Sequence, residues 1–343
     1  MMAKQTLVFI LGTQRSGTTW LANIFDSHPA CLHYYETFAP EYGVFPYFPH
    51  EFMYLDPPAE VVAARLRHDL PALIERRSRL FDPVYATRRQ FLFEAWLMLN
   101  IEKWTHRARV KPPAFATQFK LLHLNRIGQQ PVVYFPKADP VSTMAIKEVR
   151  LYFKAAFLAH AFPDAKFIHV VRHPAAVVGS MINFLQRGRL VEIRANIDRF
   201  ADTILAQPHF ASYTPLLERV RSGSQAEKLA AYWMVANETL AADAAALGAR
   251  AYPLVYEELA TDPLARVADM FAWCGLPMPA ATDDYVRESS TSRSDRKTVL
   301  DTNRVSATYY RDWVGKAPSE VLNAVEHVCG GSPLMERFAP YYR

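Results

Sequence analysis

Short apolar runs alternate with amphipathic segments along the chain. The run at residues 6–11 (TLVFIL) is followed by a turn with a glycine at each end and by an amphipathic segment at 18–27, a pattern that predicts strand, turn and helix. A second apolar run, at 166–171 (KFIHVV), also leads into an amphipathic segment, which extends to about Leu185. Strands that alternate with helices across short turns favour a parallel sheet with helices on both faces. We therefore expect an α/β fold of three layers, with a central parallel sheet flanked by helices.

The same patterns predict the remaining elements. Residues 225–247 form the clearest helix, because Gly248 follows the amphipathic segment directly. The other expected elements are helices at 59–111, at 144–162, at 263–274 and from Pro318 onward, a strand at 251–256, an aromatic ordered loop at 38–58 and an irregular polar segment at 287–316. The sequence contains no repeat, low-complexity tract or flexible linker. We expect a single domain over residues 1–343, with a loop and helical insertion at about 38–111.

The net charge of +5 comes from 39 lysine and arginine residues against 34 aspartate and glutamate residues. Arginine accounts for 28 of these cations, and its planar guanidinium suits phosphate or sulfate groups, although a high arginine content is equally compatible with an ordinary solvated surface. The five arginines between residues 76 and 89 stand among acidic residues, which is typical of a solvated helix face. We expect neither nucleic acid nor a membrane as a partner.

The cysteines and histidines favour neither a disulfide framework nor a metal site. Cys31, Cys274 and Cys329 are far apart, and the histidines lack metal-ligand spacing. The N-terminal segment lacks the features of a signal peptide, and no apolar run approaches the roughly 18 residues that a membrane span needs. We expect a cytoplasmic protein without a metal, and its oligomeric state is left open, with a homodimer among the options.

A glycine, four residues and a second glycine connect the first strand to the first helix. Gly12 and Gly17 permit tight backbone turns, so the loop amides and the helix N-terminus can bind a phosphate-like anion. Thr18 and Thr19 add hydroxyl groups, although an ordinary strand-to-helix turn with threonine caps has the same pattern. A P-loop nucleoside triphosphatase carries lysine directly after the second glycine. Here that position is Thr18 and the cation is Arg15, which counts against a kinase or an ATPase.

A second candidate anion site lies at the end of the 166–171 strand. Arg172 ends this strand, and Ser180 follows about two helical turns later. A guanidinium and a hydroxyl group can bind a second phosphate, although either residue alone is commonplace. Ligands of parallel sheets bind beyond the carboxyl ends of the strands. The two strand ends together therefore predict a ligand with phosphate-like groups at two distant points.

The two motifs, GTQRSGTTW and RHPAAVVGS, in this order resemble those of the sulfotransferases that use 3′-phosphoadenosine 5′-phosphosulfate (PAPS). The resemblance extends from about Leu7 to Tyr256 and, more weakly, to Trp313. The segment DSHPACLHYYET and the combination of Lys147 with the FPDAKF strand are similar to the branch of tyrosylprotein and bacterial sulfotransferases. This resemblance implies a P-loop-like fold, PAPS as co-substrate, adenosine 3′,5′-bisphosphate as product, and no requirement for a metal.

The resemblance also implies roles for individual residues. The 5′-phosphosulfate would be bound by Arg15, Ser16, Gly17, Thr18 and Thr19, with Trp20 adjoining. Arg172 and Ser180 would bind the 3′-phosphate, and Tyr256 would lie near the nucleotide. Glu36 would be the catalytic base, and Lys147 would assist Arg15 at the group being transferred.

Two parts of the family pattern are altered. The arginine that the tyrosylprotein branch has four residues after the serine is Phe184 here. The Arg-Lys-Gly of the cytosolic branch is reduced to Arg296-Lys297-Thr298, so the candidates for the third wall of the nucleotide site are Arg296, Lys297, Arg304 and Arg311. The cytosolic branch uses histidine as its base, which makes His123 an alternative to Glu36.

The expected activity is transfer of the sulfuryl group of PAPS to a hydroxyl or an amine of an acceptor by in-line displacement. A small molecule or specialised metabolite is the first expectation for the acceptor, with a carbohydrate or a peptide tyrosine as alternatives. The insertion at about 38–111 follows Glu36, where acceptor-shaping segments are expected. A kinase-like phosphotransferase and a non-enzymatic nucleotide-binding protein are the competing classes.

Overall fold

A central sheet of parallel strands organises the protein, seen in a computed structural model that describes residues 6–36, 38, 51–80, 141–187, 191–292 and 304–342. Within these ranges the strand order is β2-β3-β1-β4-β5, and every neighbouring pair is parallel. The strands are β1 (Thr6–Leu11), β2 (Cys31–Tyr35), β3 (Thr143–Glu148), β4 (Lys166–Val171) and β5 (Ala251–Val255). The predicted α/β class with a parallel sheet is confirmed.

Helices cover both faces of the sheet, and the side chains of β1 show how the two layers are divided. Leu7, Phe9 and Leu11 belong to one hydrophobic core, whereas Val8 and Ile10 belong to the other. This alternation is the two-residue period of a strand that is buried on both faces. The apolar run TLVFIL is therefore continuous because both of its faces are covered.

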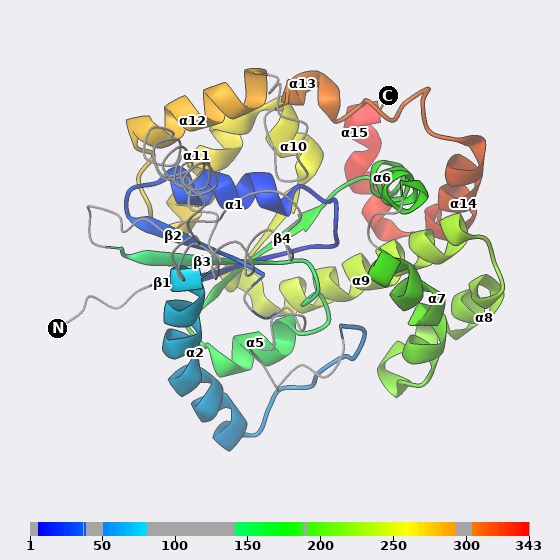
Figure 1. The fold of residues 1–343 in the computed structure, drawn as a ribbon, viewed down its shortest axis with the longest axis horizontal. Helices are drawn as coiled ribbons and strands as arrows, with labels where there is room; N and C mark the ends of the chain where they lie inside the picture. Colours follow the sequence, from blue (N-terminus) through cyan, green and yellow to red (C-terminus); the bar gives the residue numbers. More distant parts are fainter. Residues whose placement is uncertain are drawn as a thin grey trace, which may run out of the picture.

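The two helical layers differ in size (Figure 1). The layer that contains the Val8 face is built from α1 (Thr18–Ser27), α10 (Tyr256–Thr261), α11 (Pro263–Cys274) and α12 (Ala280–Thr291). The opposite layer is built from α2 (Glu60–Leu80), α5 (Ala155–Ala161), α6 (Pro174–Gln186), α9 (Gln225–Leu247) and α14 (Ser319–Cys329). The long helix α9 contacts α6 and α14, and these two helices lie beyond one end of the sheet.

Helix boundaries follow local capping chemistry. Helix α9 begins at a capping box in which Ser224 and Glu227 satisfy each other's backbone amides, and it ends at Gly248. Helix α11 begins after Asp262, whose carboxylate accepts from the amide of Ala265, and it ends at Gly275, which has a left-handed φ of 79°. The predicted bounds of these two helices, 225–247 and 263–274, are confirmed.

The predicted helix at 144–162 is wrong over its first half. Residues 143–148 form β3, and only Ala155–Ala161 is helical. Methionine, alanine, lysine and glutamate favour helix locally, but β3 pairs with β1 on one side and β2 on the other, and this pairing overrides the local preference. The predicted irregular segment 287–316 also contains the last turn of α12 and the short helix α13 (Ser306–Tyr309).

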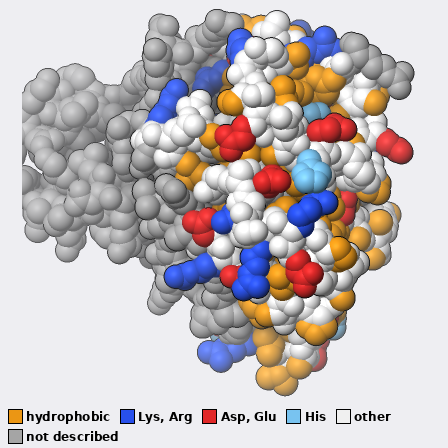
Figure 2. Space-filling model, turned by 90° about the vertical axis from the view of Figure 1, so that its right-hand side faces the viewer, with side chains coloured by type: hydrophobic (Ala, Val, Ile, Leu, Met, Phe, Trp, Pro, Cys, Tyr) orange, Lys and Arg blue, Asp and Glu red, His pale blue; other side chains and the backbone are white. Residues whose placement is uncertain are grey.

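The remaining helices form one side of the molecule. They are α7 (Val191–Leu205), α8 (Thr214–Arg221), α15 (Ala339–Tyr342) and short 3-10 turns. On the side that faces right in Figure 1, acidic and basic side chains lie beside one another (Figure 2). Exposed ion pairs such as Arg221–Asp202 at 2.6 Å connect these helices. None of the helices in the described part of the chain combines the length and apolar character needed to cross a membrane.

His169, in the middle of β4, predicts a loss of stability in acid. Its ring is buried against Asn237 on α9, at 3.2 Å from the amide oxygen, and burial lowers the pKa of His169 to about 4. The unfolded chain has a histidine pKa near 6.5, so it binds one more proton than the folded chain between about pH 6.5 and 4. The free energy of unfolding should therefore fall by about 1.4 kcal/mol for each pH unit as pH is lowered through this window.

Urea unfolding of the wild type and of His169→Gln at pH 6.5 and pH 5 measures this contribution. The wild type should lose about 2 kcal/mol more than the variant between these two values. His327→Gln is the matched control, because this histidine side chain is 56% exposed on α14 instead of buried. Equal losses in the wild type and in His169→Gln would contradict the assignment.

Candidate functional site

The loop between β1 and α1 presents backbone amides at the carboxyl edge of the sheet. Gly17 precedes α1 with a left-handed φ of 96°, and no side chain caps the first turn of this helix. Thr13 and Ser16 share a buried hydroxyl–hydroxyl hydrogen bond of 2.8 Å that holds the loop closed. The amides of Thr18 and Thr19 are among those that a helix N-terminus leaves without an intrahelical acceptor. The loop therefore has the geometry of an anion-binding turn.

Two close approaches explain why both ends of the loop are glycine. A Cβ atom on Gly12 would lie 2.5 Å from the carbonyl oxygen of Val170 in the neighbouring strand β4. A Cβ atom on Gly17 would lie 2.3 Å from Cδ2 of Tyr256, the first residue of α10. Both distances are shorter than any ordinary contact, so the loop packs tightly between β4 and α10.

Arg15 adopts a left-handed conformation, with φ at 70°, at the tip of the loop. Its Nε donates a hydrogen bond of 2.9 Å to Oγ of Ser180 on α6, and its guanidinium lies 4.5 Å from the ring centre of Phe184. The sequence predicts that Ser180 and Arg172 bind the same phosphate. In the structure, Ser180 accepts a hydrogen bond from Arg15. Phe184, the position where the related branch has arginine, supports the Arg15 guanidinium with its ring.

Arg172, directly after β4, is a buried cation with free hydrogen-bonding capacity. Its side chain is 8% exposed, and its guanidinium carbon lies 4.5 Å from the ring centre of Tyr256 and 5.5 Å from that of Tyr309. Nη1 donates a long hydrogen bond of 3.4 Å to the carbonyl oxygen of Arg15, but Nε is buried without a partner. Burial raises the pKa of Tyr256 to about 12, so this phenol is neutral. A buried guanidinium N–H without a partner is able to bind an anion.

Glu36 and Lys147 form a second charged group at the same edge of the sheet. Glu36 follows β2, with a left-handed φ of 47°, and Lys147 lies near the end of the adjacent strand β3. The Nζ atom of Lys147 lies 2.6 Å from Oε1 of Glu36, and the Glu36 amide donates to the Lys147 carbonyl oxygen at 2.8 Å. The lysine side chain is 2% exposed and the glutamate side chain 12%, so this ion pair is largely shielded from water.

Helix α12 connects the first helix to the C-terminal part of the site. The indole Nε1 of Trp20 donates to Oγ of Ser289 at 2.9 Å, and the Arg304 amide donates to the Ser289 carbonyl oxygen at 3.0 Å. The Arg304 guanidinium lies 5.6 Å from the ring centre of Tyr309. Tyr309 therefore lies between two guanidinium groups, those of Arg172 and Arg304.

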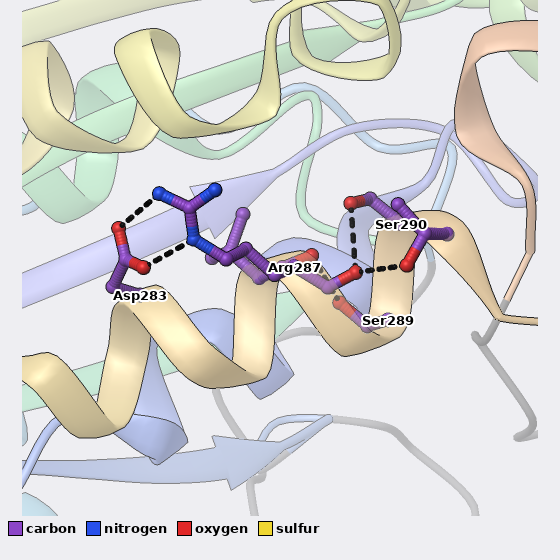
Figure 3. Close-up of polar contacts among 6 residues, drawn as sticks. Asp283, Arg287, Ser289 and Ser290 are labelled. Carbon is purple, nitrogen blue, oxygen red and sulfur yellow. Dashed lines mark hydrogen bonds and ion pairs between the residues drawn. The ribbon is translucent and has the colours of Figure 1, made fainter.

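Two other arginines in this region are already engaged. Arg287 pairs with Asp283, one helical turn earlier on the exposed face of α12, with Nε 2.5 Å from Oδ1 (Figure 3). Arg311, a candidate for the third wall, donates to the carbonyl oxygen of Tyr341 and lies over the ring of Tyr310. Arg304 and Arg311 are the two candidates for the third wall that lie among the described residues, and Arg304 is the one that shares the Tyr309 ring with Arg172. His123, Arg296, Lys297 and most of the segment 38–111 lie outside the described residues.

Sequence reasoning missed Tyr309 and Glu257. Tyr309 touches the site only because α13 folds back onto α10, for which the local sequence carries no signal. Glu257 follows Tyr256 in the chain and is buried beside Arg172 and His173. An acidic residue directly after a strand was a possible signal for Glu257. Within the described ranges, no three His, Cys, Asp or Glu side chains form a group able to hold a metal ion.

The glycine loop and the buried strand-end arginine define an α/β protein with a P-loop-like anion site. Residues 8–213 match the model of the family described as "Sulfotransferase family". This match covers more than half of the chain, and the protein belongs to the sulfotransferase family. It includes Arg15, Glu36, Lys147, Arg172 and Ser180.

Comparison with curated proteins and solved structures finds distant relatives. The chain is 22% identical to mouse carbohydrate sulfotransferase 3 over 202 residues and 24% identical to the human protein over 199 residues. These matches cover 59% and 57% of this chain but only 39% and 38% of the relatives, so the chain spans about two fifths of the length of the curated relatives it matches.

Two of the similar solved structures are a sulfotransferase domain from the Synechococcus PCC 7002 olefin synthase and mouse sulfotransferase SULT7A1 complexed with PAP. The first is 16% identical, covers 96% of both chains and has a TM-score of 0.39. The second is 11% identical, covers 99% of this chain and 90% of the other, and has a TM-score of 0.38.

Gly17→Ala tests the packing of the anion loop. Alanine at a left-handed φ costs about 1 kcal/mol, and here the added Cβ also meets the ring of Tyr256. Gly275→Ala is a matched control, because Gly275 has a similar φ of 79° and open space around its Cβ position. Urea unfolding should show a loss of about 1 kcal/mol for Gly275→Ala and a loss at least twice as large for Gly17→Ala. Equal losses would show that the close approach to Tyr256 carries no cost.

Proposed function

We propose that this protein transfers the sulfuryl group of PAPS to a hydroxyl or an amine of an acceptor. The observation that carries the proposal is the pair of anion-binding features at two adjacent strand ends. The Gly12–Gly17 loop follows β1, and the Arg172 guanidinium, with its unpartnered Nε, follows β4. A nucleotide with a 5′-phosphosulfate and a 3′-phosphate carries anionic groups at two separate points, which these two features match.

The loop fits a phosphosulfate better than a magnesium triphosphate. A P-loop phosphotransferase needs a lysine after the second glycine to reach the terminal phosphates. Thr18 occupies that position, and the cation at the loop is Arg15. This substitution favours sulfuryl transfer over the kinase-like alternative.

Residues of this chain supply binding and charge neutralisation. PAPS, when bound, supplies a sulfuryl group attached to a phosphate leaving group. Ser16, Gly17, Thr18 and Thr19 would bind the 5′-phosphosulfate through amides and hydroxyl groups, with Arg15 facing the transferred group. Preorganised donors of this kind stabilise the charge that develops during transfer and need no large rearrangement. Trp20, Ser180 and Tyr256 would complete the nucleotide site around Arg172.

Glu36 is the proposed general base, and Lys147 its partner. The Lys147 ammonium stabilises the charged carboxylate, which is the form that accepts a proton. One Glu36 oxygen would take the proton from the acceptor's hydroxyl group or amine as that oxygen or nitrogen bonds to sulfur. The bond between sulfur and the 5′-phosphate oxygen would break, and adenosine 3′,5′-bisphosphate would leave. Lys147 would then turn its charge toward the group being transferred. His123, the alternative base, remains a prediction outside the described residues.

The acceptor is proposed by class only. A hydroxyl or amine on a small molecule or specialised metabolite remains the first proposal, with a peptide tyrosine as an alternative. A carbohydrate hydroxyl is the second candidate, and it is favoured by the similarity to carbohydrate sulfotransferase 3 of mouse and human. Residues 38–111 are the expected acceptor-shaping segment.

Two measurements test the proposed function. Adenosine 3′,5′-bisphosphate should raise the melting temperature, whereas ATP with magnesium should not; the opposite result would favour the phosphotransferase. Labelled PAPS should then transfer its sulfuryl group to members of an acceptor library of phenols, carbohydrates and amines, with mass detection of the products. Binding of the bisphosphate without transfer to any acceptor class would favour the non-enzymatic alternative.

Glu36→Gln should reduce kcat by about 10²- to 10⁴-fold, because the amide cannot accept the acceptor's proton. Binding of adenosine 3′,5′-bisphosphate should stay within twofold of the wild type, since Glu36 lies at the acceptor end of the site. Glu218→Gln, at an exposed position of α8, is the control and should leave both quantities unchanged. Near-normal turnover of Glu36→Gln would shift the role of base to His123.

Arg304→Met should weaken binding of adenosine 3′,5′-bisphosphate by about tenfold, because a charge-assisted hydrogen bond to phosphate is lost. Arg311→Met is the matched control seven residues later and should bind as the wild type does, since its guanidinium already bonds Tyr341. Isothermal titration calorimetry measures both affinities. An equal loss in the two variants would indicate a general effect of positive charge.

A further inference from the structure

Glu257 is a buried carboxylate beside the proposed 3′-phosphate arginine. It lies in the first turn of α10 with no exposed surface, and its Oε1 accepts two hydrogen bonds. One comes from the His173 backbone amide at 3.1 Å and the other from the hydroxyl group of Tyr342 at 2.8 Å. Burial raises the pKa of Glu257, while the nearby charge of Arg172 opposes this shift.

Tyr342 brings the C-terminal helix α15 into this network. Its hydroxyl group accepts from the indole Nε1 of Trp313 at 3.3 Å and has Oε1 of Glu257 as its closest acceptor. The carbonyl oxygen of Tyr310, at 3.2 Å, is the other acceptor within reach. Trp313 therefore donates to Tyr342, and Tyr342 donates to Glu257.

The same C-terminal residues hold the ring of His173. The His173 ring stacks on Trp313 with 4.5 Å between ring centres and has its edge contacts with Phe338 and Tyr342. Its Nδ1 accepts from the amide of Ala175 at the start of α6. Burial lowers the pKa of His173 to about 4, so the ring is neutral and can accept this bond at pH 7. Residue 173 is thus fixed through its backbone and its side chain, directly after Arg172.

The network also keeps the carboxylate from binding Arg172. A carboxylate beside a buried guanidinium would ordinarily form a two-point ion pair, the strongest arrangement open to either group. Glu257 and Arg172 interact electrostatically but make no direct ion pair, and Nε of Arg172 has no partner. Oε2 of Glu257 is also buried without a partner. The two donors on Oε1 hold the carboxylate against the backbone of His173, in an orientation in which Oε2 does not reach the guanidinium.

We propose that Tyr342 and Glu257 are positioning residues that keep the Arg172 guanidinium available for the 3′-phosphate of the nucleotide. This inference rests on the proposed function, which assigns the 3′-phosphate to Arg172. The hydroxyl group of Tyr342 holds the Glu257 carboxylate away from Arg172. Without that hydroxyl group, the carboxylate turns to the guanidinium and competes with the phosphate.

Calorimetric titration with two nucleotides separates this effect from a general structural one. In Tyr342→Phe, the affinity for adenosine 3′,5′-bisphosphate should fall about tenfold, while the affinity for adenosine 5′-monophosphate, which lacks the 3′-phosphate, should change less than twofold. Tyr213→Phe is the matched control, because it removes a hydroxyl group that donates to another glutamate, Glu238, at the same 2.8 Å, and it should bind both nucleotides as the wild type does. Equal losses for the two nucleotides would overturn the proposal.

Rescue by a second substitution gives the sharper test. Glu257→Gln keeps an acceptor for His173 but cannot form an ion pair with Arg172, so Tyr342→Phe/Glu257→Gln should recover most of the bisphosphate affinity lost by Tyr342→Phe. A double variant that binds more weakly than Tyr342→Phe would overturn the proposal. If Tyr342→Phe does not fold, Glu257→Gln alone replaces it: it should bind the bisphosphate at least as tightly as the wild type, because the competing charge is gone and an acceptor for the His173 amide is kept, and a selective loss of bisphosphate affinity would overturn the proposal.

The nucleotide preference of the wild type shows whether the proposed function fails or only the positioning role of Tyr342 and Glu257. A wild-type protein that binds both nucleotides equally would contradict the assignment of the 3′-phosphate to Arg172, and with it the proposed function. A wild-type protein that prefers the bisphosphate, with a Tyr342→Phe variant that keeps this preference, would contradict the positioning role alone.

Discussion

The burial of the Arg172 guanidinium at the end of β4 is the constraint on which the nucleotide end of the site depends. Moving a charge out of water costs several kcal/mol unless partners replace the lost hydration. The surroundings supply only part of that replacement: two aromatic rings, a long hydrogen bond to the Arg15 carbonyl oxygen and the electrostatic effect of Glu257. The Arg172 guanidinium therefore lacks part of the hydrogen bonding and charge compensation that water would give it, and a bound phosphate group would supply both. The surrounding residues hold Arg172 in place without that phosphate.

Backbone strain is concentrated at the same edge of the sheet. Arg15 and Glu36 are the two non-glycine residues of the described chain with positive φ, at 70° and 47°. Left-handed backbone costs about 1 kcal/mol or more for such residues and persists only where the surrounding structure enforces it. Glu36 directly follows β2, which is paired with β3, and Arg15 lies in the loop between β1 and α1. The strand and the loop fix the backbone, and the left-handed conformation sets the direction of each side chain. Binding groups at strand ends are oriented in this way by the fold itself.

The parts of the site that could be predicted from sequence each consist of residues that are adjacent in the chain. The Gly12–Gly17 loop, its helix α1 and Arg172 before α6 each lie in one short segment with a recognisable pattern. Glu36 and Lys147 were found through a family resemblance, but β3 was mistaken for helix, so their ion pair across two strands could not be foreseen. The bond between Arg15 and Ser180 joins residues 165 apart, and nothing local specified it.

The residues that sequence reasoning missed share a physical character. Tyr309, Glu257 and Tyr342 act through tertiary contacts between the C-terminal segment and the start of α10. A tyrosine near a chain end has no local pattern that distinguishes a hydrogen-bonding partner from a surface residue. The packing of α13 and α15 against α10 gives these side chains their role, and packing of that kind emerges only when the sheet and its two layers are assembled.

Charge is divided between the two ends of the site in a way that suits the proposed chemistry. At the acceptor end, Lys147 and Glu36 neutralise each other within a shielded ion pair. At the end of β4, the charge of Glu257 acts on Arg172, and Oε1 of Glu257 accepts from Tyr342 and from the His173 amide. The net positive charge of the chain is thus less important than its distribution. Under the proposed function, an anionic nucleotide would bind at the end that carries the arginines, and Glu36 would accept a proton at the other end.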